Sequence, residues 1–472
     1  MSRSVHKGLA FVSTALVSLY FAGAGLADEL SPRQQFARDV YQELVEIDTT
    51  TATGDTAKAA EAMAARLKAA GFPDEDVHLF SPAPRKGNLV ARLHGSGKRK
   101  PILLLAHIDV VPALHEDWSV DPFKLTEKDG YFYARGSSDD KYMAAAFITN
   151  LIRYKQEGYK PDRDIILALE TDEEILDGNA LGIQWLLNNH RDLIDAEFAL
   201  NEGGGVGLKD GKAIRNAVQT SEKVSVSYKL EVRDRGGHSS VPRKDNAIYR
   251  LAEGLVRLSK FSFPLRLNET TRAYFKGIAQ LEGGQNAADM RALLADEPDP
   301  EAVARLSAIP GYNAQLRTTC VATMLQGGHA VNALPQLATA RVNCRIMPGE
   351  PGEEVKATLE RVLADDQIAV TQTDKAVLSA PSPMNEDILG AIDKLSREFW
   401  PGAAVLPVMS AGATDGSYLR NAGIPTYGHS GMANDINDVR AHGRDERVPV
   451  KSFYQGEEYL YRLVKMLSCE AS

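Results

Sequence analysis

Hydrophobic and polar residues alternate along this chain with two different periods. In residues 32–49 and 55–70, apolar side chains recur every three or four positions, which is typical of amphipathic helices. Residues 101–106, 164–170 and 197–203 contain short apolar runs instead, and helix-rich segments separate them. Such runs indicate strands that are buried on both faces. The alternation predicts an α/β layer with a mixed, largely parallel sheet.

The pattern changes near residue 222, where KVSVSYKLEV alternates apolar and polar side chains as a half-exposed strand does. The elements predicted from there follow the order strand, helix, strand, strand, helix and strand, at 223–232, 245–260, 318–326, 336–347, 351–364 and 367–373. This order is the pattern of a split βαβ, ferredoxin-like domain. We therefore predict a small α+β domain at 222–375, with a helical or irregular insertion at about 261–316. It would interrupt a first domain formed by 28–221 and 376–472.

The first 27 residues differ from the rest of the chain. The segment MSRSVHK carries two basic residues, and the following GLAFVSTALVSLYFAGAGLA is apolar and ends in small residues. This composition is typical of a secretory signal peptide, with Gly25 and Ala27 at a cleavage site that precedes Asp28. An uncleaved membrane anchor is the alternative, because the run is almost long enough to span a bilayer. Cleavage after Ala27 would release a periplasmic or secreted protein with no stable membrane association.

Composition narrows the class of protein further. The 472 residues are 44% hydrophobic and 25% charged, which is an ordinary globular mixture with material for a large core. The net charge of −9 argues against general binding of nucleic acids. The three cysteines form no CxxC pair and no disulfide framework. Cys320 and Cys344 could form a disulfide if their strands are neighbours, and the sequence leaves that open.

A histidine and an aspartate follow the buried run PILLLA. His107 and Asp109, in HIDVVP, point to the same side, because side-chain direction repeats every two residues along a strand. The carboxyl ends of strands are where open α/β sheets place their sites. A metal-binding imidazole usually has its second nitrogen tied to a carboxylate or carbonyl, and Asp109 is placed to provide one. Taken alone, the pair favours a plain capping or core histidine.

Acidic residues occupy the neighbouring ends of strands and loops. Asp139 and Asp140 lie in ARGSSDDK at the start of a predicted helix. Glu173 and Glu174 follow one buried strand, and Glu202 follows the next. Each acid alone would be a solvated loop charge, or a helix cap in the case of Asp139. Clustered carboxylates repel one another, and a chain tolerates them when cations compensate. Histidine with carboxylates and no cysteine suits zinc or manganese.

Three further residues lie far downstream. His238 lies in RGGHSSVP within the predicted small domain, and His442 lies in AHGRDER near the C-terminus. Arg345, in VNCRIMPG, is on a predicted strand. A guanidinium can hold a carboxylate with two hydrogen bonds, although a surface salt bridge is the simpler interpretation of a single arginine.

The motifs form an ordered set along the chain. HxD, ARGSSDDK, DEE, NEGGG, RGGHSSVP, NxxP, RxxPG, GxTD and HGxxE together resemble the M20 metallopeptidase family. That family includes carboxypeptidase G-like enzymes, succinyl-diaminopimelate desuccinylase, aminoacylase-1 and carnosinase. The resemblance spans nearly all of the chain after residue 27. It implies a dinuclear zinc catalytic domain interrupted by a lid, or dimerisation, domain, and a homodimer formed through that lid.

The resemblance implies five metal ligands. His107 would bind one metal together with Glu202, and His442 would bind the other together with Glu174. Asp139, the first acid of DDK, would bridge both metals. The two divalent ions per chain would be Zn²⁺, with Mn²⁺ or Co²⁺ as alternatives.

The resemblance also implies catalytic and substrate-binding residues. Glu173 would be the general base, and Asp109 would orient His107. His238 would reach the neighbouring subunit's site and stabilise the oxyanion. Four residues would form the substrate site: Arg345 and Asn332 at its carboxylate end, with Gly412 and Asp415 along its wall.

The chain departs from the family pattern at three positions. Tyr142 follows DDK where glycine is common, Asp445 replaces the asparagine of HGxNE, and Asn201 stands where relatives can carry an acid. The first two changes remove no ligand. His429 competes with His442 as the last ligand, and the HGxxE context favours His442.

These features predict a secreted zinc-dependent metallopeptidase. Arg345 favours a leaving half with a free α-carboxylate, so the chain would act on peptides as a carboxypeptidase or dipeptidase. The chemistry would use a metal-activated water with Glu173 as general base. An N-acyl-amino-acid amidohydrolase is the alternative. A non-catalytic binding protein on the same fold is a more remote one, since the intact Glu173 and ligand set argue against it.

Overall fold

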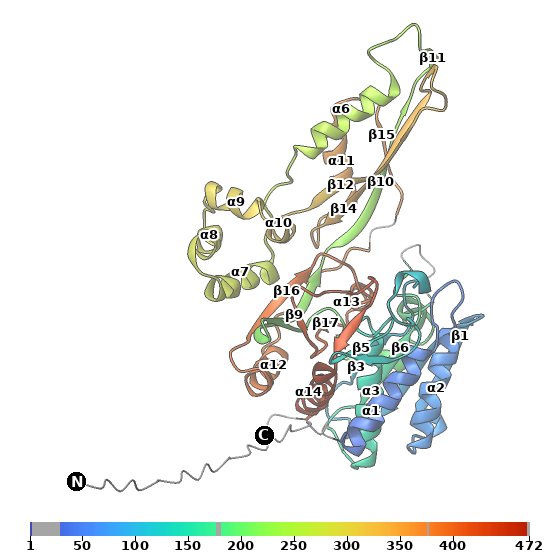
Figure 1. Cartoon of the computed structure of the whole chain (residues 1–472), viewed down its shortest axis with the longest axis vertical. Coiled ribbons are helices and arrows are strands. Elements are labelled where there is room, and N and C mark those ends of the chain that lie inside the picture. The colour runs from blue at the N-terminus through green and yellow to red at the C-terminus, as the bar shows by residue number, and fades with distance from the viewer. Residues whose placement is uncertain (2–28, 176–180, 375–376, 470–472) are drawn as a thin grey trace.

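The computed structural model describes residues 1, 29–175, 181–374 and 377–469. The predicted signal peptide and its cleavage site after Ala27 lie outside these residues, apart from Met1. Figure 1 shows a broad α/β body at one end of the long axis and a narrower body, built on a second sheet, at the other. We call these the larger body and the smaller body.

A ten-stranded mixed sheet organises the larger body. Its strands follow the order β1 (Val77–Ala83), β2 (Lys86–Leu93), β6 (Ile165–Glu170), β3 (Ile102–His107), β7 (Phe198–Asn201), β17 (Thr426–Gly428), β9 (Lys212–Glu222), β8 (Val206–Lys209) and β18 (Ala433–Asp435), with β16 (Ala404–Ser410) paired to β9. Strand β3 is parallel to both β6 and β7, and β7 is parallel to β17. Strands β1, β2 and β6 pair antiparallel. The predicted mixed sheet with parallel central strands is confirmed.

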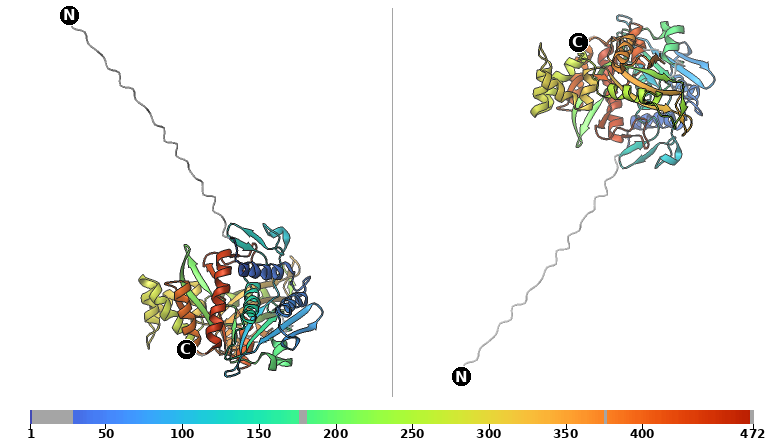
Figure 2. Two further views of the ribbon diagram at one scale, coloured as in Figure 1. Left: turned by 90° about the horizontal axis from the view of Figure 1, so that it is seen from below. Right: turned by 90° about the horizontal axis from the view of Figure 1, so that it is seen from above.

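Helices cover both faces of this sheet. One core joins it to α1 (Pro32–Glu46), α2 (Thr56–Ala69), α3 (Lys141–Gln156), α12 (Glu386–Phe399) and α14 (Val450–Ser468). A second core joins it to α4 (Ile183–Asn189), α5 (Arg191–Ile194) and α13 (Gly416–Asn421). Helix α3 lies between α1 and α14 (Figure 2). Leu104 of β3 belongs to the first core and Leu103 and Leu105 to the second. Burial of both faces therefore explains why PILLLA is apolar throughout.

Helix α1 ends three residues earlier than the pattern predicts. Ser31 caps its start, with its side chain accepting a backbone hydrogen bond in a capping box. The chain turns away after Glu46 because the carboxylate of Asp48 accepts hydrogen bonds from the backbone N–H and hydroxyl of Thr50 and from the hydroxyl of Thr53. Such local side-chain bonds compete with helix formation.

Tyr142, which departs from the family pattern, fits the interior without disturbing the start of α3. The residue is fully buried. Gly456 of α14 leaves room for it, because a Cβ at that position would lie 1.9 Å from the Tyr142 hydroxyl. Helix α3 begins at Lys141, and its close packing against α14 therefore depends on a tyrosine facing a glycine.

A four-stranded antiparallel sheet organises the smaller body. Its order is β12 (Thr319–Gly327), β14 (Leu337–Ile346), β10 (Val224–Arg233) and β15 (Ala369–Gln372). Two helices, α6 (Ala247–Ser259) and α11 (Gly352–Leu363), cover its apolar face in a separate core. The order along the chain agrees with the predicted split βαβ arrangement. Cys320 and Cys344 lie opposite each other in β12 and β14 and form a disulfide, which the sequence left open.

The insertion between α6 and β12 is helical, which is one of the two predicted alternatives. It contains α7 (Glu269–Leu281), α8 (Gly284–Leu293), α9 (Pro300–Ser307) and α10 (Pro310–Leu316). Phe275 and Ile278 pack with Leu406 of β16 in a core of their own. The insertion is therefore attached to the larger sheet, although the chain reaches it from the smaller body.

Short elements complete the chain. Strands β11 (Gly237–His238) and β13 (Ala333–Leu334) pair at the far tip of the smaller body (Figure 1). A three-stranded sheet joins β19 (Arg447–Pro449), β5 (Tyr131–Tyr133) and β4 (Thr126–Lys128), and 3-10 turns occupy Asp74–Asp76 and His115–Asp117. Among the described residues, no helix combines the length and apolar character that crossing a bilayer requires.

Candidate active site

Separate segments of the chain bring the predicted metal ligands together. His107 ends β3, Glu174 follows β6, and Glu202 follows β7. Because β6, β3 and β7 are parallel neighbours, their carboxyl ends share one edge of the sheet. Asp139 lies just before α3, and His442 comes from the loop before β19.

The two carboxylate oxygens of Asp139 contact different histidines. Oδ1 lies 3.0 Å from Nε2 of His107, and Oδ2 lies 3.1 Å from Nε2 of His442. Oε1 of Glu202 lies 4.0 Å from Nε2 of His107, and Oε1 of Glu174 lies 3.0 Å from Nε2 of His442. Asp139 therefore stands between two clusters, one with His107 and Glu202 and the other with His442 and Glu174.

The charges of these groups fit divalent cations. Burial, together with the charges of Asp139 and Glu173, raises the pKa of Glu202. Hydrogen bonds to Asp139 and Glu174 raise the pKa of His442 to about 10. Asp139 and Glu174 therefore stabilise a protonated, positively charged His442. A divalent cation between these groups would supply the same positive charge. In each cluster the ligand atoms lie within 4.8 Å of one another, and such nitrogen and oxygen sets suit zinc.

Asp109 holds His107 through its main chain rather than through its carboxylate. Its carbonyl oxygen lies 3.0 Å from Nδ1 of His107, whereas its nearer carboxylate oxygen lies 3.6 Å away. The carboxylate instead accepts hydrogen bonds from the backbone N–H groups of Glu173 and Glu174, at 3.3 and 3.2 Å. The contact to His107 is thus made by a carbonyl, one of the two expected kinds of partner, and Asp109 contacts both the histidine ring and the acidic loop.

His429, the rival of His442, lies in the protein core. Its ring is buried between the carbonyl oxygen of Ala217, at 3.0 Å, and the hydroxyl of Tyr459, at 2.8 Å. Burial lowers the pKa of His429 to about 4, so the ring is neutral near pH 7. The structure places His442, and not His429, beside Glu174.

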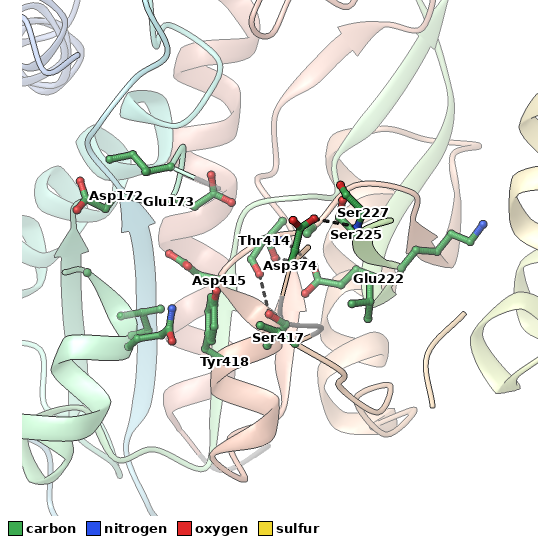
Figure 3. A pocket seen from close by; sticks show the side chains of 18 of the residues that line it. Asp172, Glu173, Glu222, Ser225, Ser227, Asp374, Thr414, Asp415, Ser417 and Tyr418 are labelled. Atoms are coloured by element: carbon green, nitrogen blue, oxygen red, sulfur yellow. Dashed lines mark hydrogen bonds between the residues drawn. The ribbon is translucent and has the colours of Figure 1, made fainter. Parts of the chain in front are cut away.

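A cleft of about 720 Å³ extends from Glu170 and Glu173, at and just after the end of β6, to the smaller body. Glu173 and Asp415 line it on the side of the larger body, and Ser225 lines it on the side of β10 (Figure 3). Arg345 of β14 also lines the cleft. Its guanidinium makes no ion pair or hydrogen bond with any residue that the structure describes. Arg345 is therefore available to an anionic group of a ligand.

Three of the predicted site residues lie elsewhere in this chain. His238, in β11, and Asn332, directly before β13, are exposed at the tip of the smaller body. We expected Asn332 to lie beside Arg345, but in this chain only Arg345 lines the cleft. Gly412 is exposed outside the cleft lining, with its N–H donating to the hydroxyl of Ser410. The role of His238 in a neighbouring subunit stays a prediction.

Comparison with known proteins decides the family. The sequence profile described as "Peptidase family M20/M25/M40" matches residues 103–466. The chain belongs to this family. Probable carboxypeptidase S-like 2 of Dictyostelium discoideum is 30% identical over 381 residues, which cover 78% of this chain and 71% of that protein. The N-fatty-acyl-amino acid synthase/hydrolase PM20D1 of Xenopus tropicalis is 30% identical over 399 residues, which cover 82% of this chain and 74% of that protein.

Solved M20 structures share the fold. The M20 family metallo-carboxypeptidase Sso-CP2 of Sulfolobus solfataricus superposes with a TM-score of 0.69 at 18% identity, over 91% of this chain and 98% of that chain. A Bacillus subtilis protein described as a dinuclear metal binding peptidase of the M20 family superposes with a TM-score of 0.57 at 12% identity, over 92% and 98%. The mixed α/β architecture of this M20 chain is thus that of M20 peptidases.

Glu446, the last residue of HGRDE in this M20 chain, was not among the predicted site residues. Its buried carboxylate accepts hydrogen bonds from Nη1 of Arg135 at 2.7 Å and from the main-chain N–H groups of Gly136, Ser138 and Asp139 at 3.0, 2.7 and 3.1 Å. Glu446 thereby ties the loop of Asp139 to the segment that carries His442. The HGxxE motif could have pointed to Glu446, but its spacing does not show that backbone amides are the hydrogen-bond partners of this carboxylate.

Replacing Glu446 by glutamine should loosen the bridging ligand. We expect Glu446→Gln to weaken zinc affinity about 10–100-fold, because residues that orient metal ligands have effects of this size. It should also lower the free energy of unfolding by about 3 kcal/mol, since Arg135 loses its buried partner. Calorimetric zinc titration and urea unfolding of the metal-free protein would measure these effects. Glu398→Gln, in the exposed pair with Arg462, is the control, and equal values for both variants would contradict the assignment.

Proposed function

We propose that this M20 chain hydrolyses an amide bond whose amine half carries a free α-carboxylate. The observation that carries the proposal is the position of Glu173 and Arg345 in one cleft. Glu173 lies in a group with His107 and Glu174, next to the clusters around Asp139. Arg345 could hold a carboxylate with two parallel hydrogen bonds. A substrate bound in this way would present its amide to Glu173.

We propose that the two clusters hold two divalent ions, zinc in the first place, with manganese or cobalt as alternatives. His107 and Glu202 would hold one ion, His442 and Glu174 the other, and Asp139 both. The composition of the clusters and the dinuclear metal binding of the Bacillus subtilis M20 peptidase support this assignment. When bound, the ions would lower the pKa of a water molecule and polarise the amide carbonyl.

Glu173 is the proposed general base. Burial raises the pKa of its carboxyl, which brings its proton affinity closer to that required of a base near neutral pH. The carboxylate takes a proton from the attacking water and gives it to the leaving nitrogen as the C–N bond breaks. The products are a carboxylic acid and an amine whose α-carboxylate stays on Arg345 until release.

Two substrate classes fit this chemistry. Peptides with a free C-terminus would make the protein a carboxypeptidase or dipeptidase, which is our first candidate, and the carboxypeptidase S-like relative supports it. N-acyl amino acids would make it an amidohydrolase. The similarity to an N-fatty-acyl-amino acid synthase/hydrolase favours this second candidate.

Matched substrates in one assay would separate the two classes. One set contains dipeptides with free amino ends, and the other contains the same C-terminal residues with an acetyl or longer acyl cap. Cleavage of the free dipeptides by the zinc-loaded protein would establish a peptidase. Cleavage of the capped residues alone would establish an amidohydrolase. Cleavage of neither set would contradict the proposed function.

We further propose that the protein is exported and forms a homodimer. The basic start and the apolar run of the first 27 residues support a cleavable signal peptide. The exposed tip that carries His238 supports a lid that reaches a second subunit. A folded chain that stays monomeric at micromolar concentration in sedimentation velocity would contradict the dimer.

His238 should affect turnover without affecting metal content. We expect His238→Ala to lower kcat by about 10²–10³-fold, the usual effect of removing one oxyanion donor. Steady-state kinetics and metal analysis of the purified variant would measure both quantities. His329→Ala, at another exposed histidine in the loop before β13, is the control. Loss of metal would make His238 a ligand, and unchanged turnover would remove it from the site.

A further inference from the structure

Tyr418 joins the protein core to the cleft. Its ring lies on α13 and packs against the core that contains Leu419 and Ile424. The same residue lines the cleft together with Glu173. Figure 3 shows its side chain rising into the cleft beside Asp415. A packed ring therefore holds a hydroxyl in the space that the substrate would occupy.

The Tyr418 hydroxyl has no hydrogen-bond partner among the residues that the structure describes. Neighbouring hydroxyls on the cleft wall are engaged: Thr414 donates to Glu222, and Ser417 donates to the carbonyl of Thr414. The buried hydroxyls of Tyr154 and Tyr228 each donate to a main-chain carbonyl. Tyr418 lines the cleft without a partner for its hydroxyl among the described residues, so this donor is available to a ligand group.

The surroundings of Tyr418 keep this hydroxyl protonated. Burial raises its pKa, and the charges of Asp415, Glu173, Glu170 and Glu222 raise it further. A protonated phenol can donate a hydrogen bond to an oxygen that gains negative charge. Tyr418 and Glu173 line the same cleft, so the hydroxyl shares the space in which the proposed base would act.

We propose that Tyr418 is a catalytic residue, whose hydroxyl donates a hydrogen bond to the oxygen of the scissile carbonyl as that oxygen becomes negative. The inference rests on the proposed function, because that function places the scissile amide beside Glu173. The core holds the ring in position, so the donor needs little rearrangement during the reaction. Tyr418 comes from the same chain as Glu173, whereas His238 would come from the neighbouring subunit.

Tyr418→Phe tests this role, because it removes the hydroxyl and keeps the ring. We expect kcat to fall about 100-fold on a dipeptide or N-acyl amino acid that the wild type cleaves, with KM unchanged. The affinity for a phosphinate analogue of the tetrahedral state should fall by a similar factor. Metal content and melting temperature should stay the same, since the hydroxyl makes no bond within the fold. Tyr249→Phe, at an exposed tyrosine on α6, is the control.

Several outcomes would overturn the assignment. An unchanged kcat in Tyr418→Phe would show that the hydroxyl takes no part in the reaction. A raised KM with an unchanged kcat would place it against the bound substrate rather than the transition state. If the wild type cleaves neither substrate set, the proposed function is refuted together with this inference. If the wild type and Tyr418→Phe cleave at the same rate, only this inference is refuted.

Discussion

Replacing Glu173 by alanine is expected to leave zinc bound and to lower kcat by about 10²–10⁴-fold, the range typical of a lost general base. Glu173 lines the cleft but belongs to neither of the two clusters that share Asp139. The variant should therefore lose proton transfer while the ligands His107, Glu174 and Glu202 remain in place. Steady-state kinetics, combined with metal analysis of the same sample, would measure both effects.

The isosteric variant Glu173→Gln should behave like Glu173→Ala, because both lack a basic carboxylate. Glu353→Ala, at an exposed acid on α11, is the control for a lost surface charge. Activity retained in both Glu173 variants would refute the general-base assignment. Loss of zinc in both would make Glu173 a metal ligand instead and would change the map of the site.

Replacing Asp139 by asparagine is expected to reduce the metal content by at least one ion per chain and to abolish turnover. Its two oxygens contact His107 and His442, and each cluster depends on one of them. Asparagine has the same shape but offers one neutral oxygen and no negative charge to share between two cations. Metal analysis after gel filtration, and zinc titration followed by calorimetry, would measure the loss.

The surface pair of His94 and Asp76 supplies a matched control. Nε2 of His94 lies 2.8 Å from Oδ1 of Asp76, outside any of the ligand clusters. Asp76→Asn should leave metal content and turnover unchanged. Two ions bound by Asp139→Asn with wild-type affinity would contradict the bridging role of Asp139.

The positions of His107 and Glu202 at the sheet edge could be predicted from the buried strands that precede them. The apolar runs before His107 and Glu202 identify buried parallel strands, and the carboxyl ends of such strands share one edge. The order of motifs then separates His442 from His429, which the structure places in the core. Periodicity places His107 and Glu202 at the ends of buried strands, whereas their roles as ligands and the choice of His442 come from the resemblance to the M20 family.

The rest of the site depends on contacts that spacing does not encode. Glu446 accepts hydrogen bonds mainly from backbone amides, and Asp109 meets His107 through a carbonyl, so residue types alone indicate neither contact. The sequence gives no sign that Tyr418 lines the cleft, because an aromatic residue on a short helix is typical of a core position, and its ring does pack against the core. The distance of Asn332 from the cleft depends on the length and direction of β12 and β14, which no short motif specifies.

The most direct test of the proposed amide hydrolysis compares one substrate in two forms. The measurement is kcat/KM of the zinc-loaded protein on a cleavable peptide or N-acyl amino acid with a free terminal carboxylate, and on the same compound as a carboxamide. Arg345 lines the cleft without an acid partner among the described residues, so we predict that the free acid is preferred about 10–100-fold, the value of one charge-assisted contact. Equal rates, or a preference for the carboxamide, would contradict the claim that this site hydrolyses amides next to a free carboxylate.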